Sequence, residues 1–207
     1  MEERPYWNMQ IEPWLGTDRM RALQLERLRT RIGQLLEHAP YFRRRMEQRG
    51  VRCPEDIRTL EDWPAALPPF TKADYRSLIE ACENDIYRLL DETLPVPLGE
   101  IVCMAATSGT TGDPQPYPFT RVDLDDSWGE YLQRARWRSG VRPGDRLVHA
   151  FALSMFAAGV PPLQSSHDDG TMQIPVGAGR GEARILQVAH VMRGGRVSCR
   201  PWLCTVV

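Results

Sequence analysis

The sequence lacks an excess of charge of either sign. Its 207 residues include 26 lysines and arginines against 27 aspartates and glutamates, and the formal net charge is −1. Proteins that bind nucleic acids or anionic membranes by charge carry a basic patch or a basic overall balance. The composition therefore predicts no nucleic-acid partner, and most of the charged side chains are expected to be solvated.

Paired cysteines and an uninterrupted apolar run are also missing. The five cysteines are scattered without the C-x-x-C spacing of zinc or thioredoxin-like sites. Residues 147–167 contain no Lys, Arg, Asp or Glu, but Gly159 and Pro161–Pro162 interrupt this run and argue against a membrane span. The polar start, Met1–Pro5, is unlike a secretory signal. These features predict a cytoplasmic chain with no membrane span and no metal site.

Residues 1–100 are predicted to be mainly helical. Apolar side chains recur at helical spacing along Asp18–His38, and Pro40 is expected to end that helix. The basic run Arg43–Arg45 has two interpretations, a surface for an acidic partner or a solvated helix face, and nearby acids favour the second. Further along, Thr71 is expected to cap a helix, with Asp74 completing a capping box.

Residues 101–207 alternate between strand and helix patterns. A helix is expected after Asp123, a second one opening within Ser154–Gly159, and a third around 185–192. The expected strands are Ile101–Ala105, Leu147–Ala152, Thr171–Val176 and Arg196–Cys199. This order predicts an α/β fold, a helical N-terminal segment followed by a mostly parallel sheet with crossover helices. Ligands in such sheets bind at the carboxyl ends of the strands.

A loop rich in glycine and hydroxyl groups follows the first expected strand, and its sequence is Thr107-Ser108-Gly109-Thr110-Thr111-Gly112. Glycine lets the backbone approach an anion, backbone N–H groups then point at it, and hydroxyls add donors without bulk. The loop is therefore a candidate phosphate site. A plain polar turn is the alternative. No Gly-Lys-Ser/Thr ends the loop, so it is not a Walker motif.

Other motifs point less clearly to chemistry. Gly177–Gly181 lies between a strand and a helix, but its glycine spacing does not fit a dinucleotide fingerprint. Ser108 lacks the Gly-x-Ser-x-Gly context of a hydrolase nucleophile. A metal interpretation of His167–Asp169 is weaker than a solvated loop. His149, inside an apolar strand, is expected to be a hydrogen-bonded core histidine.

The 107–112 loop matches the signature loop of the AMP-forming adenylating enzymes, the acyl-CoA synthetases and their relatives. Over residues 6–190, successive segments of the chain resemble segments of the phenylacetate–CoA ligase family, in the same order. The segments that carry this resemblance are Tyr6–Asn8, Leu23–Gln24, His38–Arg43, Leu60–Trp63, Leu67–Asp74, Val141–Asp145, Met155–Gly159 and Ile174–Gly179.

The resemblance implies a reaction and its ligands. Family members activate a carboxylic acid, commonly an aryl acid such as phenylacetate, with ATP and Mg²⁺, and then pass the acyl group to coenzyme A. It implies that Thr107, Ser108, Gly109, Thr110, Thr111 and Gly112 hold the ATP phosphates. It also places Phe156 and Gly159 at the acyl pocket, although a core aromatic and a turn glycine are the alternative. No catalytic residue is assigned.

The chain departs from the family pattern in two ways. Asp113 stands where a lysine commonly follows the loop, and a carboxylate there repels phosphate unless it points to solvent. Family members are also about twice as long, so the chain is expected to be a truncated first half of the large N-terminal domain. An inactive fragment, or a nucleotide- or partner-binding remnant, is therefore the alternative to an enzyme. The acid and the oligomeric state are left open.

Overall fold

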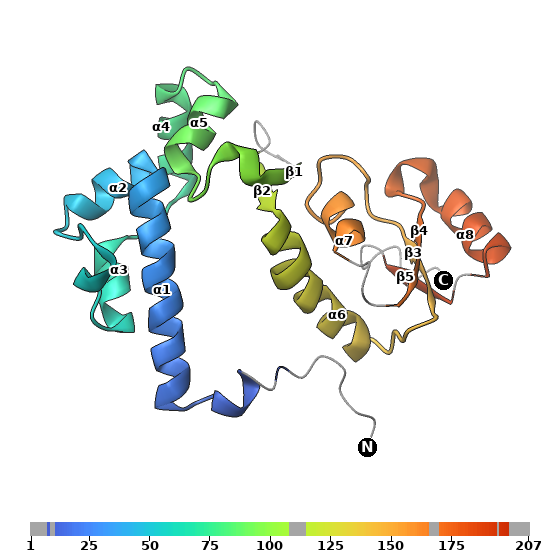
Figure 1. Cartoon of the computed structure of the whole chain (residues 1–207). Coiled ribbons are helices and arrows are strands. Elements are labelled where there is room, and N and C mark those ends of the chain that lie inside the picture. Colours follow the sequence, from blue (N-terminus) through green and yellow to red (C-terminus); the bar gives the residue numbers. More distant parts are fainter. Residues whose placement is uncertain (1–7, 9–10, 108–114, 166–169, 194, 199–207) are drawn as a thin grey trace. The chain divides into compact units, whose positions relative to one another are not determined.

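The computed structural model describes residues 8, 11–107, 115–165, 170–193 and 195–198. The chain divides into two compact units, Met1–Glu100 and Ile101–Val207. The first is helical and the second mixes helices with short strands (Figure 1). Within the described residues, no helix combines the length and the apolar character needed to span a membrane.

The helical unit is built on one long helix, α1 (Asp18–His38), with the bounds that the sequence predicts. Thr17 caps its start, because the Thr17 hydroxyl accepts a hydrogen bond from the Met20 N–H. Pro40 ends α1 and also opens the next helix, since a proline is tolerated in a first helical turn. The remaining helices are α2 (Pro40–Glu47), α3 (Trp63–Ala66), α4 (Lys72–Ala81) and α5 (Ile86–Thr93).

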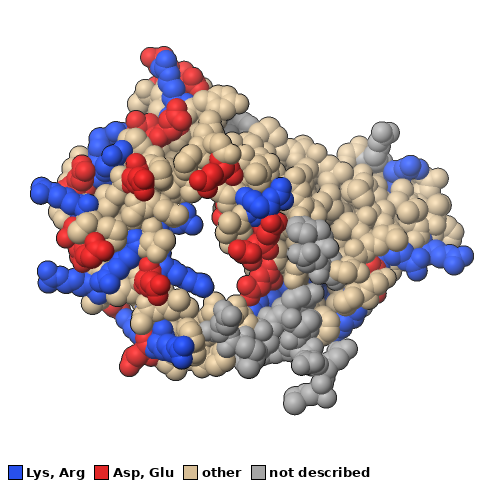
Figure 2. Space-filling model, viewed as in Figure 1, with Lys and Arg blue, Asp and Glu red and all other residues tan. Residues whose placement is uncertain are grey.

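Two buried clusters hold these helices together. Ile32 of α1 and Met46 of α2 are fully buried and pack with Ile57 from the segment that follows α2. The second cluster joins α4 and α5 and extends to the Tyr41 and Phe70 rings, whose centroids lie 5.5 Å apart. On the face shown in Figure 2, basic and acidic side chains are intermingled over the helices of this unit. The polar faces of the helices thus carry balanced charge above an apolar interior.

The second unit contains a three-stranded sheet in the order β4-β3-β5. Its strands are β3 (Arg146–His149), β4 (Met172–Pro175) and β5 (Arg196–Ser198), and both pairings with β3 are parallel. Helix α7 (Val160–Gln164) lies in the β3–β4 connection, and α8 (Gly181–Val191) connects β4 to β5. Ile185 of α8 packs on Val148 and Ile174 of the sheet, and Figure 1 shows α8 running beside these strands. The predicted parallel sheet with crossover helices is confirmed for these three strands.

The first strand of this unit belongs to a different sheet. β1 (Ile101–Ala106) pairs antiparallel with β2 (Pro116–Thr120), in a separate two-stranded sheet. The expectation that β1 joins the parallel sheet is therefore wrong. Its partner was not predicted because Pro116 and Pro118 weaken the strand signal. Prolines are tolerated in β2 because an edge strand leaves some N–H positions unpaired.

Helix boundaries in the second unit differ from the predicted ones at two places. The helix after Asp123 begins with a π-helical segment, Asp123–Trp128, and continues as α6 (Gly129–Arg138). No helix opens within Ser154–Gly159; α7 starts only at Val160, with Pro161 and Pro162 in its first turn. The apolar side chains of residues 154–159 thus do not indicate a helix. The backbone contacts of Gly159 produce a turn in this segment.

Candidate functional site

The candidate phosphate loop connects the two strands of the β1–β2 hairpin. At its base the Thr107 N–H donates to the Gln115 carbonyl oxygen at 3.0 Å, and the Gln115 N–H donates to Thr107 Oγ1 at 3.3 Å. These two bonds bring the ends of the loop together next to the last ladder pair, Ala106 with Pro116. The base of the loop is therefore held by backbone pairing on both sides.

The structure describes only part of the predicted phosphate site. Thr107 is exposed, and its hydroxyl serves to close the base of the loop. Ser108, Gly109, Thr110, Thr111 and Gly112 lie outside the described residues, and so does Asp113. Gln115 was not predicted to take part. The signal for it was the alternation of Tyr117 and Phe119 after the loop, which is typical of a returning strand.

Phe156, the predicted acyl-pocket residue, lies against the strand from which this loop leaves. It forms an isolated parallel bridge with Ala106, and the Ala106 N–H donates to the carbonyl oxygen of Met155. The centroids of the Phe151 and Phe156 rings lie 6.5 Å apart. The structure thus brings the base of the candidate phosphate loop and one predicted pocket residue together, although nearly fifty residues separate them in sequence.

Gly159, the second predicted pocket residue, is buried in a tight turn. Its N–H donates to the Phe156 carbonyl oxygen at 2.8 Å. A Cβ atom placed on Gly159 would meet the Ala152 carbonyl oxygen at 2.0 Å and the Phe156 carbonyl oxygen at 3.1 Å. Only glycine allows this approach between backbones, so Gly159 shapes the path of residues 152–159.

His149 ends β3 and is 1% exposed. Its ring centroid lies 5.7 Å from that of Phe151. Burial lowers the pKa of the imidazole, and the positive charge of Arg136 lowers it further, whereas the nearby backbone of Gly159 acts in the opposite direction. The predicted burial is confirmed. The predicted hydrogen bond stays a prediction, and the backbone of Gly159 is the hydrogen-bonding group beside the imidazole.

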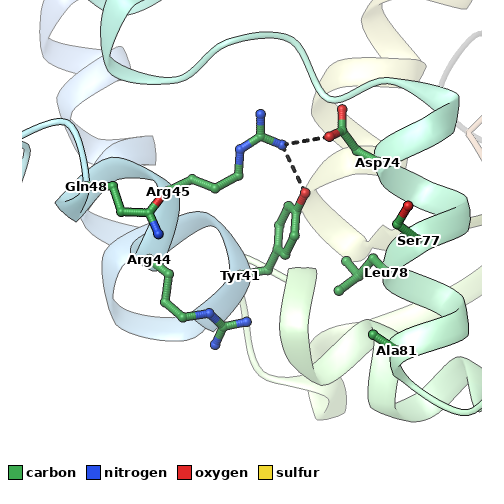
Figure 3. Close-up of a pocket in the computed structure, with 8 residues that line it drawn as sticks. All are labelled: Tyr41, Arg44, Arg45, Gln48, Asp74, Ser77, Leu78 and Ala81. Atoms are coloured by element: carbon green, nitrogen blue, oxygen red, sulfur yellow. Dashed lines mark hydrogen bonds and ion pairs between the residues drawn. The ribbon is translucent and has the colours of Figure 1, made fainter.

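A hollow of about 340 Å³ lies between α2 and α4 of the helical unit (Figure 3). The Arg45 guanidinium donates to the Tyr41 hydroxyl at 2.9 Å and lies 3.6 Å from an Asp74 carboxylate oxygen. Arg44 pairs with Glu92 of α5 at 2.7 Å. The basic run predicted to be a solvated helix face is therefore partly engaged in ties between helices. Its charges are balanced by acids of the same unit.

Metal-ligating side chains do not gather in the described residues. No three His, Cys, Asp or Glu side chains among residues 8, 11–107, 115–165, 170–193 and 195–198 lie close enough to hold a metal ion. His167, Asp168 and Asp169, for which the solvated-loop interpretation was favoured, lie outside those residues.

Comparison with known proteins identifies relatives over most of the chain. No protein-family model matches it. It is 32% identical over 197 residues to the phenylacetate-coenzyme A ligase of Thermus thermophilus, and 30% identical over 177 residues to that of Escherichia coli. These matches take in 93% and 84% of the chain but only 41% and 38% of the two relatives. The chain thus spans about two fifths of their length.

Solved structures agree with the sequence matches. A 2-hydroxyisobutyryl-CoA ligase in complex with 2-HIB-AMP and CoA, in its thioesterification state, matches 88% of the chain with a TM-score of 0.72 and 28% identity. An open conformation of this ligase matches 99% of the chain with a TM-score of 0.76 and 25% identity. The chain covers 37% and 47% of those structures. By sequence and by fold, the chain is therefore similar to a part of the phenylacetate-coenzyme A ligases and of an adenylate-forming CoA ligase.

Proposed function

We propose that the chain takes part in the ATP-dependent activation of a carboxylic acid. In this reaction the acid carboxylate attacks the α-phosphorus of ATP, which gives an acyl-adenylate and releases pyrophosphate. The thiol of coenzyme A then displaces AMP and gives the acyl-CoA thioester. An aryl acid such as phenylacetate is the proposed substrate, because relatives of that name match up to 93% of the chain. This match is the observation that carries the proposal.

The geometry of the hairpin supports a phosphate site at residues 107–112. The Thr107–Gln115 pairing holds both ends of the loop at one point, so the glycines and hydroxyls between them start from a fixed base. Fixed donors stabilise charge that develops as a phosphate group leaves. We assign Ser108–Gly112 to the ATP phosphates, and Thr107 to closing the loop. ATP, when bound with Mg²⁺, supplies the adenylyl group and the leaving pyrophosphate.

Phe156 and Gly159 fit a proposed pocket for the acyl group. The Ala106–Phe156 bridge sets this segment beside the base of the loop, as a reaction between an acid and a nucleotide phosphate requires. The rings of Phe151 and Phe156 offer apolar surface to an aryl or alkyl group.

We also propose a cytoplasmic location, because the described cysteines, Cys53, Cys82 and Cys103, are free thiols.

A second candidate is a protein that binds a nucleotide or a partner without catalysis. It is kept because the chain spans only about two fifths of its curated relatives, so activity of the 207-residue chain must be measured separately. Pyrophosphate exchange into ATP that depends on an added acid would identify adenylation. MgATP binding without exchange would favour the second candidate.

Gly109→Val tests the loop assignment directly. A bulky side chain there should keep the backbone from the phosphates, so MgATP affinity should fall by about tenfold or more. Thermal stabilisation by MgATP reports that affinity, since a ligand at a hundred times its Kd stabilises by about 2.7 kcal/mol.

Gly179→Val is the matched control. A Cβ at Gly179 meets nothing within 4 Å, and this glycine lies in the other glycine-rich loop of the same unit. The parent chain and Gly179→Val should therefore be stabilised by MgATP to the same extent. Undiminished stabilisation of Gly109→Val would contradict the assignment of the loop. Loss confined to Gly179→Val would assign nucleotide binding to residues 177–181.

A further inference from the structure

The hollow between α2 and α4 has no role in the proposed function (Figure 3). It lies within the helical unit and is lined by eight described residues. Its volume of about 340 Å³ is large enough for a small organic molecule. The Arg45 guanidinium of α2 contacts the Tyr41 hydroxyl and the Asp74 carboxylate of α4, so these contacts hold the two walls of the hollow together.

The walls of the hollow carry more positive than negative charge. Arg44 and Arg45 are cationic, and Asp74 is the acid among the eight lining residues. The Asp74 carboxylate is already engaged, because it accepts hydrogen bonds from the Thr71 N–H and hydroxyl and lies 3.6 Å from Arg45. Glu92, which pairs with Arg44, belongs to α5 and does not line the hollow. A ligand that enters the hollow therefore meets an excess of one positive charge.

Several hydrogen-bond donors at the hollow have no acceptor. A guanidinium carries five N–H groups. Both side-chain contacts of Arg45 involve Nη1, and the bond from Arg44 to its acid involves Nη2. The other guanidinium N–H groups, the Gln48 amide and the Ser77 hydroxyl make no hydrogen bond to the described residues. The hollow thus offers donors to a ligand that accepts hydrogen bonds, and an ionised carboxylate is such a group.

Charge and size together favour one class of ligand. A carboxylate carries a single negative charge, which matches the excess on the walls. A phosphate group carries about −1.5 to −2 near neutral pH, so the Asp74 carboxylate would repel it more strongly. Arginine can bind a carboxylate through two parallel N–H···O bonds. Leu78 and Ala81 of α4 also line the hollow and offer apolar surface to a short hydrocarbon group (Figure 3).

We infer that this hollow is a binding site for a small organic monocarboxylate. Arg44 and Arg45 hold its carboxylate, and its hydrocarbon body packs on the apolar part of the α4 wall. The inference does not depend on the proposed function, because the site lies within Met1–Glu100 and takes no part in the proposed reaction.

The experiment titrates the full 207-residue chain at neutral pH and constant ionic strength, with the NMR resonances of assigned N–H groups as the readout. Butyrate is the probe. The comparison compounds are 1-butanol, which has the carbon chain without the charge, and inorganic phosphate, which has charge without the carbon chain. Butyrate should produce saturable shifts at Arg44, Gln48 and Ser77. Its Kd should be lower than that of either comparison compound by about tenfold or more, since hydrogen bonds to charged groups are the stronger ones.

Two variants, each with a matched control, locate the site. Arg44→Gln should raise the Kd for butyrate about tenfold. Arg43→Gln removes the same charge from a neighbouring residue that does not line the hollow, and should raise this Kd by less than about twofold. Ala81→Phe should prevent binding by filling the hollow, whereas Ala73→Phe, at an exposed position of the same helix outside the lining, should not. Arg44 and Ala81 are exposed, so both variants are expected to fold.

The titration of the parent chain tests the inference without any variant. The absence of saturable shifts in α2 and α4 would overturn it, and so would phosphate or 1-butanol that binds as tightly as butyrate. Equal effects of Arg43→Gln and Arg44→Gln, or undiminished binding of butyrate by Ala81→Phe, would also overturn it. None of these outcomes bears on MgATP binding or on pyrophosphate exchange, so the proposed function is tested separately.

Discussion

Single residues of the second unit have roles that their sequence context only partly predicts. Gly159 was expected at an acyl pocket on resemblance alone, whereas the structure gives it a steric reason. Its α-carbon approaches the Ala152 carbonyl so closely that any side chain would overlap the backbone. His149 illustrates a second case, because its burial follows from the apolar strand around it, whereas its proximity to the backbone of Gly159 does not. At the scale of a residue, backbone proximity and hydrogen-bond satisfaction depend on neighbours that are distant in sequence.

Gly159→Ala should destabilise the second unit. The added Cβ would lie 2.0 Å from a backbone oxygen, so the turn must shift, at an expected cost of about 3 kcal/mol. Denaturant unfolding of parent and variant measures this cost. Gly179→Ala is the matched control, since its Cβ has open space and should change stability by less than about 0.5 kcal/mol. Equal stability of Gly159→Ala and the parent would show that the turn is looser than described.

At the scale of the element, an aspartate caps several helix starts of the helical unit in the same way. The Asp74 carboxylate accepts hydrogen bonds from the Thr71 N–H at 2.7 Å and from its hydroxyl at 2.6 Å, while Thr71 Oγ1 accepts from the Asp74 N–H. Asp56 and Asp62 accept two backbone N–H bonds each in the same way. Each carboxylate supplies a hydrogen-bond acceptor to backbone N–H groups at the start of a helix, which have no acceptor within the helix itself.

These bonds make the capping device sensitive to acid. The hydrogen bonds from the Thr71 side chain and backbone, assisted by the charge of Arg45, hold the pKa of Asp74 below the ordinary value of 3.8. The unfolded chain therefore takes up the proton at a higher pH than the folded one. The stabilisation by ionised Asp74 is present above the unfolded value and is lost as the pH falls through the folded value.

Asp74→Asn should consequently be less stable than the parent near neutral pH, and the difference in stability should narrow as the pH falls below about 5. Urea unfolding at a series of pH values measures both. Ser77→Ala, an exposed position on the same helix, is the control and should follow the parent at every pH. A gap between parent and Asp74→Asn that stays constant down to about pH 3 would contradict the assignment.

At the scale of the whole molecule, the described clusters of buried side chains each belong to one of the two units. Those built on Ile32 and Leu78 lie within Met1–Glu100, and those built on Val148 and Phe119 lie within Ile101–Val207. Each unit is therefore expected to owe its stability to its own interior.

Two core substitutions test this expectation. Met46→Ala and Ile185→Ala each remove a fully buried side chain from a helix, so each should cost about 3 kcal/mol in its own unit. Hydrogen–deuterium exchange read by mass spectrometry should show faster exchange in peptides of residues 18–93 for Met46→Ala. For Ile185→Ala it should show this in peptides of residues 101–198. Faster exchange of both regions in both variants would show that the units unfold as one.

Features that depend on neighbours along the chain could be predicted from the sequence. Thr17 and Pro40 set the bounds of α1, and Thr71 with Asp74 starts α4, because a cap acts within one helical turn. The three parallel strands followed from short apolar runs between turn signals. The 107–112 motif and its ordered neighbours indicated the relationship to CoA ligases that the comparisons support.

The contacts between segments that are distant in sequence became known from the three-dimensional fold. β1 pairs with β2 instead of joining the parallel sheet, and Phe156 meets Ala106 at the base of the loop. The steric need for Gly159 and the proximity of its backbone to the His149 ring also arise from contacts between distant segments. The two kinds of feature differ in the separation along the chain over which the interactions act. Propensity and capping act over a few residues. Strand pairing, backbone crowding and burial of polar groups depend on contacts between segments far apart in the chain.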